Sequence, residues 1–210
     1  MSLLILRNLL KTFGGLVAMN SVTFSVDEAS IVGLIGPNGA GKTTTFNIIT
    51  GNYRPDSGEV IFDRKDITGR PTHKIVELGI ARTFQNIRLF NDLTVAENLM
   101  VAMNDSVRYG LAGSILHFPR YAREEHIARE RTEELLSIFH MESHADERAG
   151  SLPYGAQRRL EILRALASNP CLLLLDEPAA GMNPSETAEL MENIRKIRDT
   201  FQIAVLLIEH

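Results

Sequence analysis

Gly36-Pro37-Asn38-Gly39-Ala40-Gly41-Lys42-Thr43 is the stretch that predicts the fold, because it matches the phosphate-binding pattern G-x-x-x-x-G-K-[ST]. Residues 31–35, immediately before it, are short and apolar, as in a buried strand, and residues 43–50 contain no Gly or Pro and favour a helix. Strand, glycine-rich loop and helix in this order form the arrangement in which the motif works. An ordinary glycine-rich turn is the alternative, and the matching flanks on both sides argue against it.

The chemistry of this loop follows from its residue types. Glycines permit positive φ angles and leave no side chain in the way, so successive backbone N–H groups can surround phosphate oxygens. The helix N-terminus adds a partial positive charge. We expect Lys42 to reach the β- and γ-phosphates and the Thr43 hydroxyl to hold Mg²⁺. The nucleotide-binding residues expected here are Gly36, Pro37, Asn38, Gly39, Ala40, Gly41, Lys42, Thr43 and Thr44.

A second strong signal lies downstream, where five apolar residues, 171–175, favour a central parallel strand buried on both faces. Asp176 and Glu177 follow at the end of the strand where open α/β sheets bind ligands. We expect Asp176 to hold Mg²⁺, directly or through water, and Glu177 to orient or deprotonate an attacking water. Two carboxylates after a strand mean little alone, but together with the phosphate loop they predict a functional site.

Three other features do not decide a function when each is taken alone. Phe13 can be a core residue, or it can present an aromatic face on which a nucleotide base stacks. Gln85 ends an expected strand, 80–85, and taken alone it is an ordinary loop residue. Pro153 and Gly155 stand just before an apolar helical stripe, so this stretch is either a second anion site at a helix N-terminus or only the start of an amphipathic helix.

The bulk composition is that of a globular protein: 210 residues, 44% hydrophobic and 23% charged. A net charge of −4 argues against a broad surface for nucleic acid. No apolar run approaches the length of a membrane span, and the N-terminus lacks the features of a signal peptide. The single cysteine, Cys171, excludes a disulfide framework and is expected to be a buried structural thiol. We therefore expect a cytoplasmic chain with no membrane span of its own and no nucleic-acid partner.

Domain organisation is predicted from a change in character along the chain. Residues 3–10 and 22–26 favour antiparallel strands ahead of the phosphate loop. Glycine is sparse between residues 86 and 147, and the phosphate-site chemistry is missing there. Two helix starts carry capping residues, Thr94 followed by Glu97, and Asn183 followed by Pro184. We expect one domain, 1–210, with an α/β nucleotide-binding core and N-terminal antiparallel β subdomain in 1–85 and 168–210, and an inserted helical subdomain in 86–167.

At this point the sequence resembles the ATP-binding subunit of ABC transporters over essentially its whole length. The phosphate loop is similar to Walker A, and residues 172–177 are similar to Walker B with its catalytic glutamate. Leu152-Pro153-Tyr154-Gly155-Ala156 is similar to the signature loop, usually Leu-Ser-Gly-Gly-Gln, and residues 179–183 are similar to the D-loop. The resemblance implies an α/β fold with a P-loop NTPase core of the RecA-like type.

The resemblance also implies roles for single residues. Gln85 falls at the Q-loop, Phe13 at the aromatic that stacks on adenine, and His210 at the switch histidine that contacts the γ-phosphate. The implied catalytic residues are Glu177, His210 and Gln85. The implied metal ligands are Thr43, Gln85 and Asp176. The implied nucleotide contacts beyond the phosphate loop are Phe13, Leu152, Tyr154, Gly155 and Ala156.

Residues 81–90, 154–162 and 176–184 resemble the ATPases of branched-chain amino acid importers, as does the excursion around 109–119, which the similar lipopolysaccharide-export ATPases usually lack. The resemblance implies ATP hydrolysis with Mg²⁺ that powers import of branched-chain or related hydrophobic amino acids. It implies a head-to-tail partner, an identical or related ATP-binding subunit, whose signature loop completes each ATP site. It also implies transmembrane permease subunits, with residues 85–93 as their docking surface, and a peripheral position on the cytoplasmic face of the inner membrane.

Several points depart from the family pattern. Pro153 replaces the signature serine and so brings neither a hydroxyl nor a backbone N–H to the γ-phosphate. Tyr154 replaces a glycine, and family members normally continue beyond the position of His210. Two other classes of function are alternatives. A GTPase should carry Asn-Lys-x-Asp, and no Asn-Lys occurs, while a small-molecule kinase gives no reason for the signature-like helix start. A nucleotide-responsive regulator without transport is the other alternative.

Overall fold

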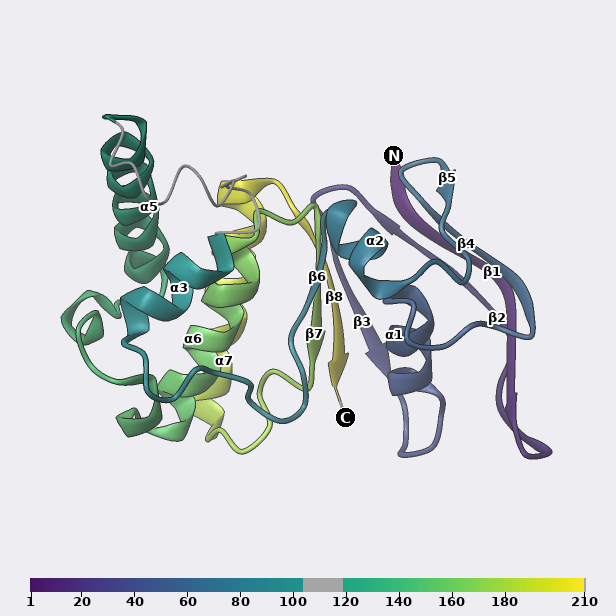
Figure 1. Cartoon of the computed structure of the whole chain (residues 1–210). Coiled ribbons are helices and arrows are strands. Elements are labelled where there is room, and N and C mark those ends of the chain that lie inside the picture. The colour runs from purple at the N-terminus through teal and green to yellow at the C-terminus, as the bar shows by residue number, and fades with distance from the viewer. Residues whose placement is uncertain (104–118, 210) are drawn as a thin grey trace. The chain divides into compact units, whose positions relative to one another are not determined.

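The structure is a computed structural model that describes residues 1–103 and 119–209 (Figure 1). Its contacts divide the chain into two compact units, one of Met1–Gln85 with Pro170–His210 and the other of Asn86–Asn169. His210 and nearly all of the expected excursion at 109–119 lie outside the described residues. The expectations made for them are therefore not addressed by the structure.

The first unit contains an antiparallel sheet in the order β2-β1-β4-β5. Its strands are β1 (Ser2–Phe13), β2 (Leu16–Asp27), β4 (Ser57–Phe62) and β5 (Lys65–Asp66). Gly14 and Gly15 join β1 to β2, and both have positive φ, 52° and 89°, as the tightest hairpin turns require. The strands are longer than the runs expected at 3–10 and 22–26. Bulges interrupt the regular alternation of the β1–β2 pair, so the sequence pattern marks only part of each strand.

The same unit contains a parallel sheet in the order β3-β8-β7-β6. Its strands are β3 (Ile31–Ile35), β6 (Ile80–Arg82), β7 (Leu172–Asp176) and β8 (Ala204–Glu209). Every residue of β7 is buried, as its leucines predict for an inner parallel strand. Cys171 just before β7 is exposed, so the expected buried thiol is wrong: the strand begins one residue later than the apolar run.

Three helices complete this unit: α1 (Lys42–Ile49), α2 (Thr72–Glu77) and α7 (Pro184–Phe201). Figure 1 shows α1 between the two sheets, and its Phe46 and Ile49 are buried in the core that both sheets share. The predicted start of α7 is confirmed, because Asn183 and Glu186 form a reciprocal capping box with Pro184 at the first helical position. The carboxyl ends of β3 and β7 lie on one edge of the parallel sheet, and residues 36–44 follow β3 there.

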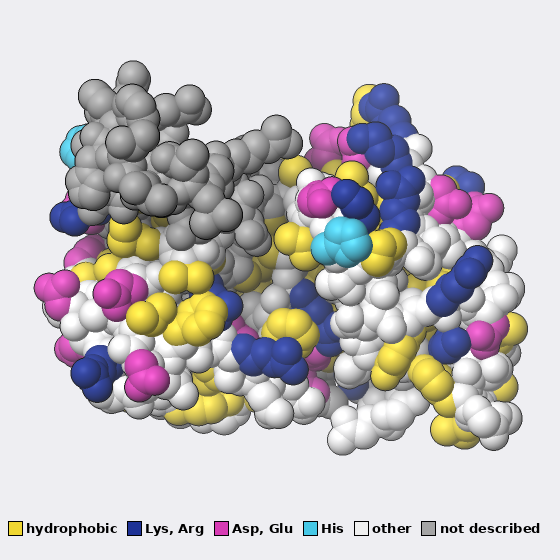
Figure 2. All heavy atoms as spheres, viewed as in Figure 1, with side chains coloured by type: hydrophobic (Ala, Val, Ile, Leu, Met, Phe, Trp, Pro, Cys, Tyr) yellow, Lys and Arg dark blue, Asp and Glu magenta, His cyan; other side chains and the backbone are white. Residues whose placement is uncertain are grey.

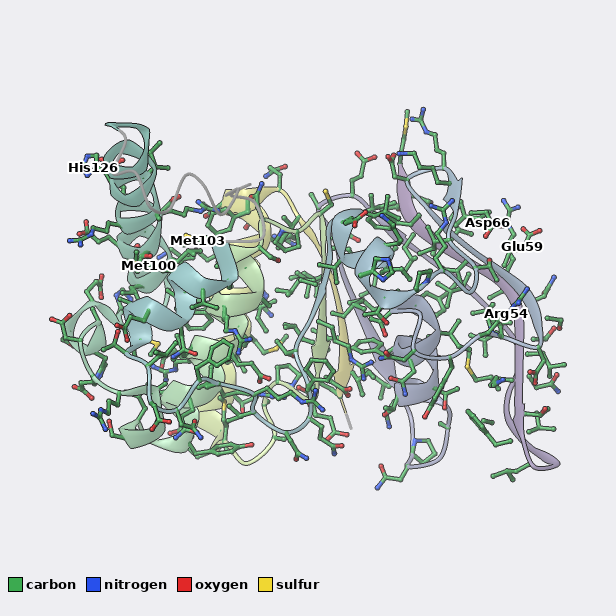
Figure 3. All side chains as sticks on the ribbon, in the orientation of Figure 1. Arg54, Glu59, Asp66, Met100, Met103 and His126 are labelled. Carbon is green, nitrogen blue, oxygen red and sulfur yellow. The ribbon has the colours of Figure 1, made fainter. Side chains whose placement is uncertain are left out.

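The second unit is helical: α3 (Val95–Met103), α5 (Pro119–Ile138) and α6 (Tyr154–Ala167), with short 3₁₀ turns at Glu142–His144 and Ala149–Ser151. The predicted capping box at the start of α3 is confirmed, since the backbone N–H of Thr94 donates to the Glu97 carboxylate and that of Glu97 donates to the Thr94 hydroxyl. Met100 and Met103 lie on α3 (Figure 3), and Met103 is buried. Within residues 1–103 and 119–209, no helix has both the length and the apolar character needed to cross a membrane.

Candidate nucleotide-binding site

A pocket of about 300 Å³ lies in the first unit beside the phosphate loop. It is lined by Phe13, by residues 16–18 of β2, by residues 37–44 and by Glu177. The structure thus brings together, around one cavity, residues that the sequence analysis chose from three separate stretches. Gly36 is not among the lining residues, but its carbonyl accepts a hydrogen bond from Lys42.

The backbone of the loop explains its glycines. Gly39 and Gly41 both have φ of 83°, a left-handed conformation that side chains disfavour. At Gly41 a Cβ atom would lie 2.5 Å from the backbone oxygen of Ala18, so β2 leaves no room for a side chain. Gly41 is also the N-cap of α1, and no side chain caps this helix. The first N–H groups of α1 therefore face the pocket and remain available to an anion.

Lys42 brings positive charge to the same place. Its ammonium group donates hydrogen bonds to the backbone oxygen of Gly36 and, over 3.2 Å, to that of Pro37. The side chain thus folds back over the loop, and these two acceptors are uncharged. A phosphate oxygen is a stronger partner for an ammonium group than a carbonyl is, because both groups are charged.

Phe13 also lines the pocket. Its side chain is 41% exposed, so it is a surface aromatic and not a core residue. The ring packs against the ring of Tyr53 with the centroids 5.2 Å apart and the planes at 69°. An exposed ring in a pocket beside a phosphate loop is available to stack on a flat base.

Two carboxylates follow β7 and differ in their surroundings. Asp176 is buried, and its Oδ2 accepts a hydrogen bond of 2.8 Å from the guanidinium of Arg82. Glu177 lines the pocket with φ of 49°, a left-handed conformation that is uncommon for this residue type. Its Oε2 accepts from the Gln85 side-chain amide at 3.3 Å. The structure therefore brings Gln85 next to Glu177 at the end of the sheet.

Arg82 is a residue that the sequence analysis missed. It bridges Asp176 to α1, because it also donates to the side-chain oxygen of Asn47 over 2.7 Å. Its guanidinium lies 5.4 Å from the ring centroids of both Phe46 and Phe84. An arginine within a short strand that pairs with an apolar buried strand was a usable signal, because such a charge needs a nearby carboxylate.

Oxygen donors for Mg²⁺ are present among these residues. The Thr43 hydroxyl, the Asp176 carboxylate and the Gln85 amide supply the hard oxygen ligands that Mg²⁺ prefers. No group of three or more His, Cys, Asp or Glu side chains suited to a metal occurs in the part of the chain that the structure describes. This donor set fits an ion that takes its remaining ligands from phosphate oxygens and water.

The signature-like loop belongs to the other unit, at the start of α6. Leu152 is buried, Tyr154 is 50% exposed, and nothing lies within 4 Å of a Cβ built at Gly155. Pro153 is the N-cap residue and supplies no side-chain hydrogen bond. The loop is held instead by Gln157, whose side-chain amide donates to the backbone oxygen of Leu152 over 2.9 Å. The residues that line the pocket all come from the first unit.

Comparison with known proteins identifies the family. Residues 19–180 match the model of the ABC transporter family. The chain belongs to the ABC transporter family. It is 45% identical over 208 residues to the high-affinity branched-chain amino acid transport ATP-binding protein LivG of Salmonella typhimurium. The matched region covers 99% of this chain and 82% of LivG.

Solved structures of ABC transporter cassettes have the same fold. The ADP conformation of MJ1267, an ATP-binding cassette of an ABC transporter, has a TM-score of 0.85 and 33% identity over 100% of this chain and 82% of MJ1267. The dimeric structure of MJ0796, a bacterial ABC transporter cassette, has a TM-score of 0.80 and 26% identity over 99% of this chain and 88% of MJ0796. The predicted P-loop NTPase fold and the predicted membership of the ABC ATPases are therefore confirmed.

Proposed function

We propose that this ABC ATPase is the ATP-hydrolysing subunit of an importer of branched-chain or related hydrophobic amino acids. The observation that carries the proposal is the pocket, which unites an exposed aromatic ring, a phosphate loop and a carboxylate. The identity with LivG, whose name describes branched-chain amino acid transport, supports the choice of cargo. We further propose that residues 1–210 act as one ABC ATPase domain, with 86–167 as its inserted helical subdomain.

In this proposal each part of the pocket has one task. The base stacks on Phe13, and the triphosphate lies against the N–H groups of residues 37–44. Lys42 exchanges the carbonyl oxygens of Gly36 and Pro37 for β- and γ-phosphate oxygens. When bound, Mg²⁺ supplies charge neutralisation between those two phosphates, and Thr43, Asp176 and Gln85 are the residues that would hold it.

Glu177 is the proposed general base. It is placed at the pocket wall and takes a hydrogen bond from Gln85, which fixes its carboxylate. Glu177 then orients the attacking water and accepts its proton. His210 remains the proposed contact to the γ-phosphate.

We propose that a second ATP-binding subunit, identical or related, completes each site with Leu152, Tyr154, Gly155 and Ala156 of its signature loop. The dimeric structure of the MJ0796 cassette supports such an assembly. An uncapped N-terminus of α6 can face the triphosphate from the side opposite the phosphate loop. Pro153 makes this half of the site weaker in hydrogen-bond donors than a serine would.

The proposed docking surface for the permease subunits is residues 85–93. Phe90 there is 45% exposed, and its backbone N–H and carbonyl are both hydrogen-bonded to the Asn98 side chain at 3.0 Å. The guanidinium of Arg164 lies 4.7 Å from the centroid of the Phe90 ring. An apolar side chain that is exposed and yet held in place suits a protein contact. Through such partners the chain would lie on the cytoplasmic face of the membrane.

The first test is steady-state hydrolysis of Mg-ATP over a range of protein concentrations. We expect specific activity to rise with concentration, because each site needs two subunits, and to vanish in Lys42→Ala. Glu177→Gln should bind ATP normally and hydrolyse it at least about 100-fold more slowly. Glu59→Gln, on the antiparallel sheet away from the pocket (Figure 3), is the matched control.

Each result has a clear meaning. Unchanged turnover in Glu177→Gln would show that another group is the base, and an absence of ATP binding by the wild-type chain would reject the function itself. Competition of ATP with GTP tests the base preference. The cargo is tested separately, by reconstitution with permease subunits in proteoliposomes and uptake of labelled leucine. Uptake that does not depend on Lys42 would contradict the proposed role in import.

A further inference from the structure

The segment that carries Phe13 is paired with only one neighbouring strand of its sheet. Phe13 is the last residue of β1, and the two-glycine turn follows it. On one side β4 pairs with β1 only as far as Leu10, which is opposite Ser57. On the other side the register with β2 shifts twice, between Leu9 and Lys11 and between Lys11 and Thr12. The pairing with β2 continues to Phe13, which is opposite Leu16, so the end of β1 is held by one strand across an irregular register.

Asp56, in the turn before β4, supplies further support. Its Oδ2 accepts hydrogen bonds from the backbone N–H of Thr12 over 2.7 Å and from the Thr12 hydroxyl over 2.8 Å. Its Oδ1 accepts from the ammonium group of Lys11 over 2.9 Å. Its own backbone N–H donates to the carbonyl of Leu10 over 2.9 Å. One residue thus holds three consecutive residues immediately ahead of Phe13.

The ring of Phe13 is held directly as well. Tyr53 packs against it with centroids 5.2 Å apart, and the Lys11 ammonium lies 5.4 Å from its centroid. The backbone N–H of Tyr53 donates over 3.0 Å to the carbonyl of Asn47 in α1, the helix that begins at Lys42. The turn at residues 53–56 therefore links the exposed ring to the helix of the phosphate loop.

We propose that Asp56 is a positioning residue for the base: it fixes the end of β1 so that Phe13 is already placed for stacking when a nucleotide arrives. Tyr53 braces the ring from its side. A ring held in its bound position loses less conformational freedom on binding, so affinity rises without any contact between Asp56 and the ligand. This inference rests on the proposed binding of ATP, and it concerns only the part of the ligand that carries the base.

The positioning role predicts that the variants lose affinity for ATP but not for a phosphate chain without a base. Base–aromatic stacking corresponds to about fivefold to 150-fold in affinity, so Phe13→Ala should weaken ATP binding by a factor in that range. Asp56→Ala should weaken ATP binding about three- to tenfold, because it removes only part of the stacking contribution. Inorganic tripolyphosphate has no base, and its affinity should stay within about twofold in both variants. Titration calorimetry of the purified chain measures both ligands.

A double-mutant cycle separates positioning from general damage, because a residue that acts through Phe13 has nothing to act on once that ring is removed. Asp56→Ala should therefore add less than about a twofold effect in the Phe13→Ala background. The matched control is Asp66→Ala, labelled in Figure 3, whose carboxylate accepts from the Thr68 backbone N–H over 2.8 Å and does not line the pocket. Asp56→Asn keeps one acceptor oxygen and replaces the alanine variant if circular dichroism shows that the latter does not fold.

The possible outcomes decide between the two proposals. Three results would each overturn the positioning role. Asp56→Ala could weaken the binding of ATP and of tripolyphosphate equally, or it could leave ATP binding unchanged. It could also cause the same loss of affinity in the Phe13→Ala background as in the wild type. A wild-type chain that binds tripolyphosphate but gains nothing from the base would reject a base platform altogether. A wild-type chain that binds neither ligand would contradict the proposed function, whatever Asp56 does.

Discussion

Replacing Arg82 by methionine should destabilise the protein far more than the loss of an ordinary ion pair. The Arg82 and Asp176 side chains are only 8% and 3% exposed, and their nitrogen and oxygen atoms are 2.8 Å apart. Methionine fills much of the space but deprives the buried Asp176 carboxylate of the Arg82 guanidinium. Removing one member of a buried pair costs about 3–5 kcal/mol. Since small proteins are stable by only about 5–15 kcal/mol, Arg82→Met should lose a large fraction of the free energy of unfolding.

Urea unfolding followed by circular dichroism, without nucleotide or Mg²⁺, measures this loss. The matched control is Arg7→Met, because Arg7 and Glu59 form a pair of 3.8 Å whose side chains are 56% and 59% exposed. Such exposed pairs contribute about 0–1 kcal/mol. Adding Asp176→Asn to Arg82→Met should restore part of the stability, since the buried negative charge that Arg82 had balanced is then removed as well. If Arg82→Met loses no more free energy of unfolding than Arg7→Met, burial does not make this ion pair important. If the double variant is no more stable than Arg82→Met alone, the loss of the charge partner is not the cause of the destabilisation.

Three further outcomes are expected. Pro153→Ser should gain about 1 kcal/mol of stability from a side-chain cap on α6 and lose about 0.4–1 kcal/mol from the missing rigidity of proline. Because these two terms nearly cancel, a change in ATP hydrolysis at unchanged stability would report the new hydroxyl. Asn183→Ala breaks the capping box with Glu186 and should cost about 1 kcal/mol in urea unfolding; a neutral result would contradict that role. Hydrogen bonds from Lys11 and Thr12 lower the pKa of Asp56 from 3.8 to about 2. The ionised carboxylate therefore contributes fully to folding stability above pH 3.8, and this contribution disappears as the pH falls towards 2. Acid unfolding of Asp56→Asn should therefore show a weaker pH dependence in that window.

The parts of the fold that the sequence predicted correctly are those with local causes. The phosphate loop needs glycine at Gly41 because the backbone is left-handed and β2 is close, and a short motif records this need. The apolar run at 171–175 predicted an inner parallel strand because burial on both faces leaves no polar position. Capping at Thr94 was predicted because Glu97 lies three residues later, and capping at Asn183 because Pro184 follows at the first helical position.

The strands of the antiparallel sheet were predicted only in part. β2 runs from Leu16 to Asp27, whereas the alternating pattern was visible only in residues 22–26. Bulges shift the register at several points, and each shift exchanges the inward and outward sides, so a simple period of two disappears. The exposed position of Phe13 has the same origin, because its side of the strand depends on a register that the sequence does not reveal.

Residues that support the site were missed for a reason that also explains how the site works. Arg82 acts on a partner 94 residues away and Asp56 on one 44 residues away, so no local pattern marks either of them. Groups that face a ligand can be grouped in a short loop, because the loop's own backbone sets their geometry. The side chains that fix the positions of those residues must come from other elements, because a segment cannot restrict its own motion relative to the rest of the protein. A motif therefore identifies the chemistry of such a site, while the precision of the site depends on single side chains in neighbouring turns and strands, where substitutions can weaken binding without touching the ligand.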